Sequence, residues 1–233
     1  MNESDQPMAR GPLAATWGAG AAALAALMAL VVGFILAIPA FLFDGSAETG
    51  ELGTNALVGA QLATAIGFLV VPFWLASRPG GGLVAAARRL GLRRFDSSAW
   101  GWAAVAAVAY FTFVIIYATL IINPEQEDIA SSFGAVPIQF FLIVICASLS
   151  EEICFRGMLF GGFRGRFGRV GAALGAALLF GLLHVTTGVT AVVPLIAFGF
   201  ILALLYEKTG SLWPSILLHA ANNSLALWAL QAG

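Results

Sequence analysis

The sequence predicts an all-α protein, a polytopic bundle of about seven transmembrane helices. Of its 233 residues, 60% are hydrophobic and only 10% are charged, whereas soluble domains carry roughly 25% charged residues. The mean hydropathy is +0.93, and the apolar residues run in stretches long enough to cross a bilayer. The net charge of −1 gives no basic surface for a nucleic acid. We therefore expect a multi-pass protein of a cell membrane, surrounded by the lipid bilayer and without a nucleic-acid partner.

Each predicted span is an apolar stretch of about 20 residues bounded by polar or charged segments. The first contains about thirty apolar residues, far more than the roughly 7–15 of a signal-peptide core, so we expect it to be retained as a helix. The fifth and sixth spans are separated only by the letters TTGV. In chain order the spans are 14–43, 55–77, 99–122, 135–159, 170–186, 189–206 and 213–231.

Basic residues occur in the loops on one side of the predicted bundle and not in those on the other. The loops 78–98, 160–169 and 207–212 hold Arg78, Arg88, Arg89, Arg93, Arg94, Arg164, Arg166, Arg169 and Lys208. The alternate loops, 44–54, 123–134 and the turn near 187, hold acidic residues instead: Asp44, Glu48, Glu51, Glu125, Glu127 and Asp128. The positive-inside rule therefore places the N-terminus, with its tail of residues 1–13, in the cytoplasm. The preference for Arg over Lys, with abundant Ala and Gly, favours a bacterial inner membrane.

The loop 78–98 also contains the letters GLVAAARRLGLRRF, residues 82–95. Such a sequence can form a short basic amphipathic helix that lies along the cytoplasmic lipid surface. An ordinary charged loop fits the same letters equally well, so the sequence leaves both interpretations open.

The stretch ASLSEEICFRGMLF places charged side chains inside a predicted span. A charge at the centre of a bilayer costs roughly 2.5–3.5 kcal/mol on insertion scales, and such residues therefore mark functional sites. Five ionisable residues lie within the fourth, fifth and seventh spans: Glu151, Glu152, Arg156, His184 and His219. They include both histidines of the chain, and we expect the three spans to bring them to one site.

Helical spacing shows which of these residues share a face of their helix. Residues four apart share a face, so Glu152 and Arg156 can form an ion pair, whose role is structural or chemical. Glu151 is turned about 100° away and has no cation at that spacing, which makes it the candidate general base. In the seventh span, His219 shares a face with Asn223.

Each of these residues also has a purely structural interpretation. An intramembrane histidine, or Asn223, can hold helices together by hydrogen bonds, and the adjacent Asn222 can take the place of Asn223. Phe180, four residues before His184, fits packing better than chemistry. The combination of residues on three spans, rather than any one of them, favours a site.

The chemistry of this set is that of acyl-bond hydrolysis. A carboxylate and an imidazole can hold and deprotonate a water molecule, while a second imidazole and an amide can donate hydrogen bonds to the oxyanion of a tetrahedral intermediate. The substrate bond that fits is a peptide bond. Glu151, His184 and His219 also form a His₂Glu set of the kind that holds a catalytic Zn²⁺, although the zinc-protease signature HExxH is absent.

Three short motifs follow one another along the chain. The letters EEICFR (Glu151 to Arg156) match EExxxR, FGLLH (Phe180 to His184) matches FxxxH, and HAANN (His219 to Asn223) matches HxxxN. In this order, on successive hydrophobic segments, they resemble the CPBP family. That family comprises the CAAX-protease-related and bacteriocin-processing intramembrane endopeptidases, also called the Abi family. The resemblance covers residues 150–223.

The resemblance implies an all-helical endopeptidase with a cavity open to the cytosol and the membrane. It assigns water activation to Glu151 and His184, and oxyanion stabilisation to His219 and Asn223. Members are treated as metalloproteases or as glutamic endopeptidases, so Zn²⁺ at Glu151, His184 and His219 stays an open alternative. We accordingly divide the chain into motif-free helices over 14–134 and a CPBP-like catalytic core over 135–233.

The expected substrate is a membrane-associated protein or peptide. Two functions of other classes use the same residues. In a transporter or proton-coupled carrier, Glu151, Arg156 and the histidines would form an ion relay. In an immunity or scaffold membrane protein, the same side chains would only hold the helices together.

Overall fold

The computed structural model describes residues 15–44, 52–121, 129–185 and 188–232, and within these ranges the chain forms helices and no strand. The predicted all-α class is therefore confirmed. The N-terminal tail 1–13 lies outside the described residues. So do the acidic residues Glu48, Glu51, Glu125, Glu127 and Asp128.

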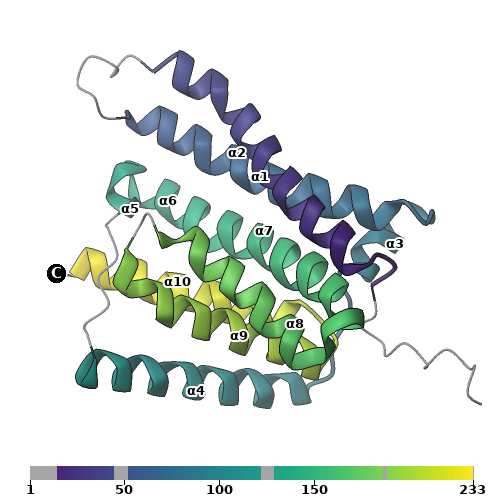
Figure 1. The fold of residues 1–233 in the computed structure, drawn as a ribbon. Helices are drawn as coiled ribbons and strands as arrows, with labels where there is room; N and C mark the ends of the chain where they lie inside the picture. The colour runs from purple at the N-terminus through teal and green to yellow at the C-terminus, as the bar shows by residue number, and fades with distance from the viewer. Residues whose placement is uncertain (1–14, 45–51, 122–128, 186–187, 233) are drawn as a thin grey trace, which may run out of the picture.

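The first two long helices, α1 (Ala19–Leu42) and α2 (Thr54–Ser77), pack side by side along one edge of the molecule (Figure 1). Small residues lie at their interface: a Cβ on Gly33 of α1 would meet the backbone of Thr64, and one on Gly59 of α2 would meet Ala40. A Cβ on Gly67 of α2 would overlap the carbonyl group of Ala29. Small residues let two helix backbones approach closely, which is how helices associate in a membrane.

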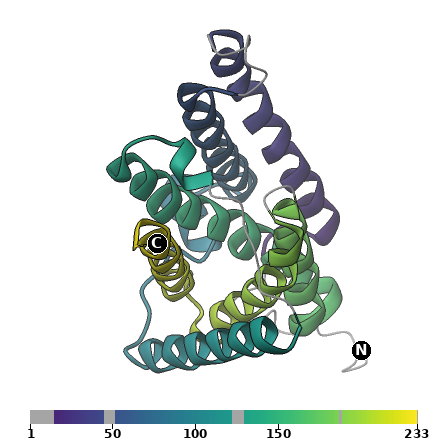
Figure 2. The ribbon, with the colours of Figure 1, turned by 90° about the vertical axis from the view of Figure 1, so that its left-hand side faces the viewer.

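The helix α4 (Ser98–Leu120) lies on the opposite edge, and the remaining helices fill the space between (Figure 2). A short α5 (Ile129–Ser132) and α6 (Val136–Gln139) lead into the central helical stretch. That stretch contains a π-helical segment η3 (Phe140–Ala147), then α7 (Ser148–Glu152), a second π-helical segment η4 (Ile153–Phe160), and α8 (Gly161–Leu183). After a 3₁₀ turn, η6 (Val189–Ala191), the chain ends in α9 (Val192–Thr209) and α10 (Trp213–Ala232).

Five of these helical stretches are long and apolar enough to cross a membrane. They are Ala19–Leu42, Thr54–Ser77, Ser98–Leu120, Val136–Leu183 and Val189–Thr209. The fourth has 48 residues and joins the predicted spans 135–159 and 170–186. The seventh predicted span corresponds to α10, which is not among the five; its middle carries the polar residues His219, Asn222 and Asn223.

The loop predicted at 160–169 is wrong, because these residues are helical on both sides of a break at Gly168. Gly168 has φ 66° and ψ −179°. A residue with a Cβ is strained at this φ, whereas glycine adopts it freely. The chain therefore changes direction at one residue and needs no separate loop.

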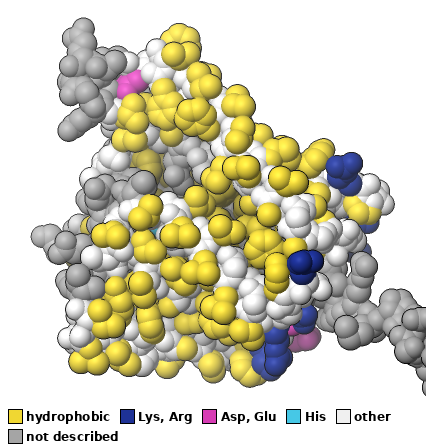
Figure 3. Space-filling view, viewed as in Figure 1, with side chains coloured by type: hydrophobic (Ala, Val, Ile, Leu, Met, Phe, Trp, Pro, Cys, Tyr) yellow, Lys and Arg dark blue, Asp and Glu magenta, His cyan; other side chains and the backbone are white. Residues whose placement is uncertain are grey.

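The helix α3 (Gly82–Arg89) confirms a short helix within the basic 78–98 segment. Its Leu83 and Val84 are 72% and 67% exposed. Large apolar side chains cover much of the outer surface, and Lys and Arg side chains gather at one end of the bundle (Figure 3). A multi-pass membrane protein has this distribution; which side of the membrane that end faces stays a prediction.

Candidate active site

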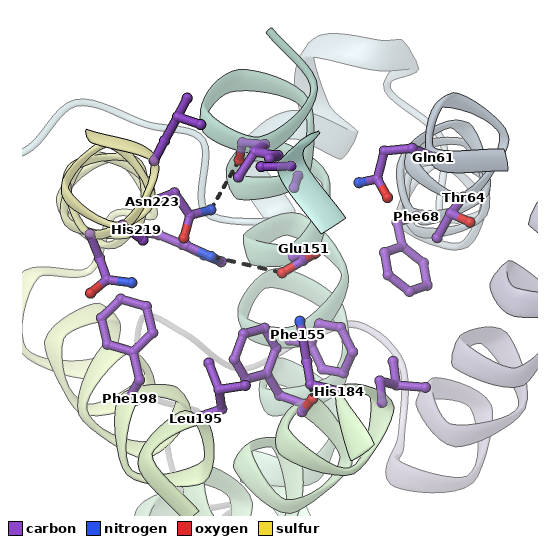
Figure 4. A pocket seen from close by; sticks show the side chains of 18 of the residues that line it. Gln61, Thr64, Phe68, Glu151, Phe155, His184, Leu195, Phe198, His219 and Asn223 are labelled. Carbon is purple, nitrogen blue, oxygen red and sulfur yellow. Dashed lines mark hydrogen bonds and ion pairs between the residues drawn. The ribbon is translucent and has the colours of Figure 1, made fainter. Parts of the chain in front are cut away.

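A pocket of about 630 Å³ lies inside the bundle and collects the polar residues of three predicted spans. Glu151 of α7, His184 after α8, and His219 and Asn223 of α10 all line it (Figure 4). These residues are separated by up to 72 positions in the sequence (223 − 151). The packing of the helices brings them to one place.

The two adjacent glutamates have different surroundings. Glu151 lines the pocket and its side chain is 16% exposed, whereas the side chain of Glu152 is fully buried. The five residues of α7 that carry them are bounded on both sides by the π-helical segments η3 and η4. Such departures from the α-helix occur frequently at functional sites.

The ion pair predicted between Glu152 and Arg156 is confirmed, with 2.7 Å between Oε1 and Nη1 and both side chains buried. The Arg156 guanidinium also lies 4.6 Å from the centre of the Phe180 ring. The same Glu152 Oε1 is 2.9 Å from Nδ1 of His219. Glu152 therefore links the cation on its own helix to the imidazole on α10, a contact that helical spacing did not predict.

The ring of His219 contacts two aromatic rings and is held at one nitrogen. Phe180 and Phe198 contact it edge-on, with ring centres 5.9 and 5.4 Å away. Because a carboxylate only accepts hydrogen bonds, the Nδ1 that faces Glu152 carries the hydrogen. The other nitrogen, Nε2, lies 3.8 Å from Oε2 of Glu151. The second nitrogen of His219 is thus directed at Glu151 in the pocket.

His184 caps the C-terminal end of α8, and the same helix fixes its ring. Its Nδ1 is 2.9 Å from the carbonyl oxygen of Phe180, and the two rings lie 4.9 Å apart between centres. A carbonyl oxygen only accepts, so Nδ1 donates and Nε2 is the acceptor nitrogen of the neutral ring. Figure 4 shows the ring pointing from α8 toward Glu151.

Asn223 lines the pocket but uses its amide nitrogen to hold two helices together. Its Nδ2 donates to the carbonyl oxygen of Ile143, at 3.0 Å, and to Oγ of Ser148, at 3.3 Å. Both acceptors lie on the central stretch, in η3 and at the start of α7. An amide nitrogen has two hydrogens, so this arrangement occupies both. Asn222 lines the same pocket.

A zinc ion at this site would need Glu151, His184 and His219 to converge on one point. Among the residues that the structure describes, no three His, Cys, Asp or Glu side chains come together in a group that could hold a metal ion. His219 directs one nitrogen to Glu152 and the other to Glu151. Glu151, His184 and His219 are thus not gathered around one point, and a zinc ion held by them stays a prediction.

Residues of α2 complete the wall that faces Glu151, and the sequence motifs did not indicate them. Gln61, Thr64 and Phe68 line the pocket from one face of α2 (Figure 4). Phe68 packs edge-on against Phe155, with 5.7 Å between ring centres. The only signal in the sequence was the presence of an amide side chain in the middle of an apolar span.

Residues 133–225 match the model of the family described as type II CAAX prenyl endopeptidase Rce1-like. These residues are similar to that family. The match includes all three motifs and confirms the resemblance to the CPBP family, and it indicates an intramembrane protease. The helices α1, α2 and α4 lie outside the matched residues. The comparisons with curated proteins and with solved structures gave no match.

Proposed function

We propose that the protein is an intramembrane endopeptidase in which Glu151 and His184 activate a water molecule that cleaves a peptide bond of a membrane-associated protein or peptide. The position of Glu151 supports the proposal. The Glu151 carboxylate is the accessible member of the glutamate pair, it lines the pocket with His184, and it lies 3.8 Å from Nε2 of His219. The pocket thus brings together a general base, the Glu151 carboxylate, and two imidazoles, those of His184 and His219.

In the first step, the water is held between the Glu151 carboxylate and Nε2 of His184. Glu151 takes a proton from the water while the water oxygen bonds to the carbonyl carbon of the peptide. The electron pair of the C=O bond moves to the carbonyl oxygen, which becomes an oxyanion. The oxyanion then re-forms the C=O bond, the C–N bond breaks, and the proton held by Glu151 passes to the leaving amine.

His219 is the oxyanion donor in this proposal. Its Nδ1 is held by the buried Glu152 carboxylate, which fixes the ring and balances the charge of a protonated imidazole, so that Nε2–H can donate. Removing one oxyanion donor typically lowers kcat by about 10²–10³-fold. Asn223 is the second donor only when it exchanges its bond to the Ile143 carbonyl for the oxyanion.

The decisive variant is Glu151→Gln, assayed with internally quenched CaaX-type peptides, with and without a farnesyl group, in detergent micelles. Loss of a positioned base lowers turnover by about 10²–10⁴-fold, and we expect at least that. Glu207→Gln, at the partly exposed pair with Arg164, is the matched control and should retain full activity. A Glu151→Gln protein that still cleaves would rule out this base. A wild type that cleaves neither peptide would favour the carrier or scaffold.

The variant Asn223→Ala distinguishes two roles of this residue: a hydrogen-bond donor to the oxyanion, and an anchor that holds two helices together. As a donor, Asn223 should affect kcat by about 10²-fold and leave KM unchanged. As an anchor, its loss should instead lower the melting temperature, because the Ile143 carbonyl is left unpaired at a cost of about 1–3 kcal/mol. Ser148→Ala, which removes one partner of the same amide, should reproduce only the anchor effect.

The metal-free mechanism has its own test. Elemental analysis of purified, chelator-treated enzyme should find less than one zinc per chain with peptide cleavage retained. Stoichiometric zinc that disappears in His184→Ala and His219→Ala, together with inactivation by the chelator, would contradict it.

A further inference from the structure

The wall of the pocket opposite Glu151 contains an amide side chain, Gln61. It belongs to α2, one of the five candidate membrane spans, and it is half-buried. Figure 4 shows its amide pointing from α2 into the pocket, on the side that faces Glu151. A Gln side chain in an apolar span is directed at the interior of the bundle or at a cavity, and here it reaches the cavity.

The amide of Gln61 forms no hydrogen bond with any described residue. Two other polar residues of the pocket, Thr64 and Asn223, are already engaged. The Thr64 hydroxyl, three residues along the same face, donates to the Ala60 carbonyl at 3.0 Å, and Asn223 donates to Ile143 and Ser148. Gln61 therefore offers two N–H donors and a carbonyl acceptor to a molecule in the pocket.

A peptide that enters this pocket needs hydrogen-bond partners for its backbone groups. For cleavage, its backbone must be extended past Glu151, without the internal hydrogen bonds of a helix. Many side chains around it are apolar, including Leu30, Phe68 and Leu195, and a buried peptide group without a partner is costly. A primary amide can accept from a peptide N–H and donate to a peptide C=O at the same time.

We propose that Gln61 binds the backbone of the peptide substrate, adjacent to the bond that is cleaved. It is a substrate-binding residue, supplied by a helix outside the residues that match the family model. The inference rests on the proposed endopeptidase function. It also predicts that recognition at this point is independent of the substrate side chain, because the contacts are with main-chain atoms.

The test pairs a change in the enzyme with a change in the peptide backbone. In a Glu151→Gln background, binding of a dye-labelled farnesylated CaaX peptide is measured by fluorescence anisotropy in detergent micelles. In a peptide series, each backbone amide in turn is replaced by an ester, which removes one N–H donor. We expect one position at which the ester raises Kd by about 3- to 10-fold, the effect of one hydrogen bond.

That penalty should disappear when Gln61 is replaced by Met, which has similar length and no hydrogen-bonding amide. Thr64→Val, on the same face of α2, should keep the full ester penalty. Both variants should match the parent in melting temperature. Any merely structural role of Gln61 would raise Kd equally for all peptides and leave the ester penalty in place.

The outcomes separate this inference from the proposed function, with cleavage measured in parallel on Glu151-containing protein. An ester penalty that persists in Gln61→Met, or that no position shows, overturns the role of Gln61 even if the enzyme cleaves. A penalty removed by Gln61→Met, with no cleavage by the wild type, supports the role of Gln61 and overturns the endopeptidase proposal. Absence of saturable peptide binding overturns the inference.

Discussion

Two Arg–Glu pairs lie along the central helical stretch and its neighbours, and they differ in their surroundings. Arg156 and Glu152 are 2.7 Å apart with side chains 1% and 0% exposed. Arg164 and Glu207 form a bidentate pair, at 2.9 and 2.6 Å, with side chains 32% and 17% exposed. The chemistry is the same, but only the first pair continues into the pocket, because its carboxylate also binds His219.

The difference shows that the function of an ion pair depends on what else its members touch. Ion pairs near a solvated surface contribute about 0–1 kcal/mol, so Arg164 and Glu207 mainly join the ends of α8 and α9. A buried pair adds little net stability, but breaking it is costly. We infer that the pair of Glu152 and Arg156 is retained for the orientation that it imposes on His219.

The largest effect on stability is expected from Glu152→Gln. This change leaves the Arg156 guanidinium buried without a carboxylate, at a cost of about 3–5 kcal/mol. For a chain of this size, that corresponds to a decrease in melting temperature of roughly 6–20 °C, measured by differential scanning fluorimetry in detergent. Peptide cleavage should decrease as well. By comparison, Glu151→Gln should abolish cleavage while the melting temperature stays within a few degrees of wild type; equal destabilisation of both variants would contradict the assignment.

A second variant separates stability from orientation. Replacing both members, Glu152→Leu with Arg156→Met, removes the buried charges together and should restore most of the lost stability. His219 then has no acceptor for Nδ1, and we expect kcat to stay lower by about 10²-fold. Full activity in a stable double variant would show that Glu152 does not position His219.

The smallest effect is expected at the partly exposed pair. Glu207→Gln should change the free energy of unfolding by about 1 kcal/mol or less. The difference from wild type should shrink further at high salt, because solvent-exposed charges are screened. A large, salt-independent loss of stability would mean that the two pairs are more alike than their exposure indicates.

The sequence was sufficient to predict the fold class and the local ion pair. Long apolar stretches predicted a helical membrane bundle, and the four-residue spacing of Glu152 and Arg156 predicted their contact. The sequence did not predict the break at Gly168, where one glycine replaces a loop. It also did not predict the π-helical segments, because i→i+5 hydrogen bonds in so short a run leave no periodicity in the apolar residues.

The sequence motifs named residues that line the pocket, but they did not predict the contacts between those residues. The three motifs contain Glu151, His184, His219 and Asn223, all of which line the pocket. The bond from Glu152 to His219 joins residues 67 positions apart, and helical spacing says nothing about such a distance. Gln61 has no motif around it, and its position became meaningful only when α2 was seen to form a wall of the pocket.

The π-helical segment η4 sets the phase of the helix that follows it. A π turn holds one residue more than an α-helical turn between hydrogen-bonded groups, and so resembles an α-helix with an inserted residue. Deleting one residue within Ile153–Phe160 would let this stretch close into an uninterrupted α-helix and leave the helix after it facing the same way. With all of its residues present, closing the stretch as an α-helix would instead turn everything after it by about 100° about the helix axis. The π turn of η4 therefore sets the direction in which α8 presents Phe180 and His184 to the pocket.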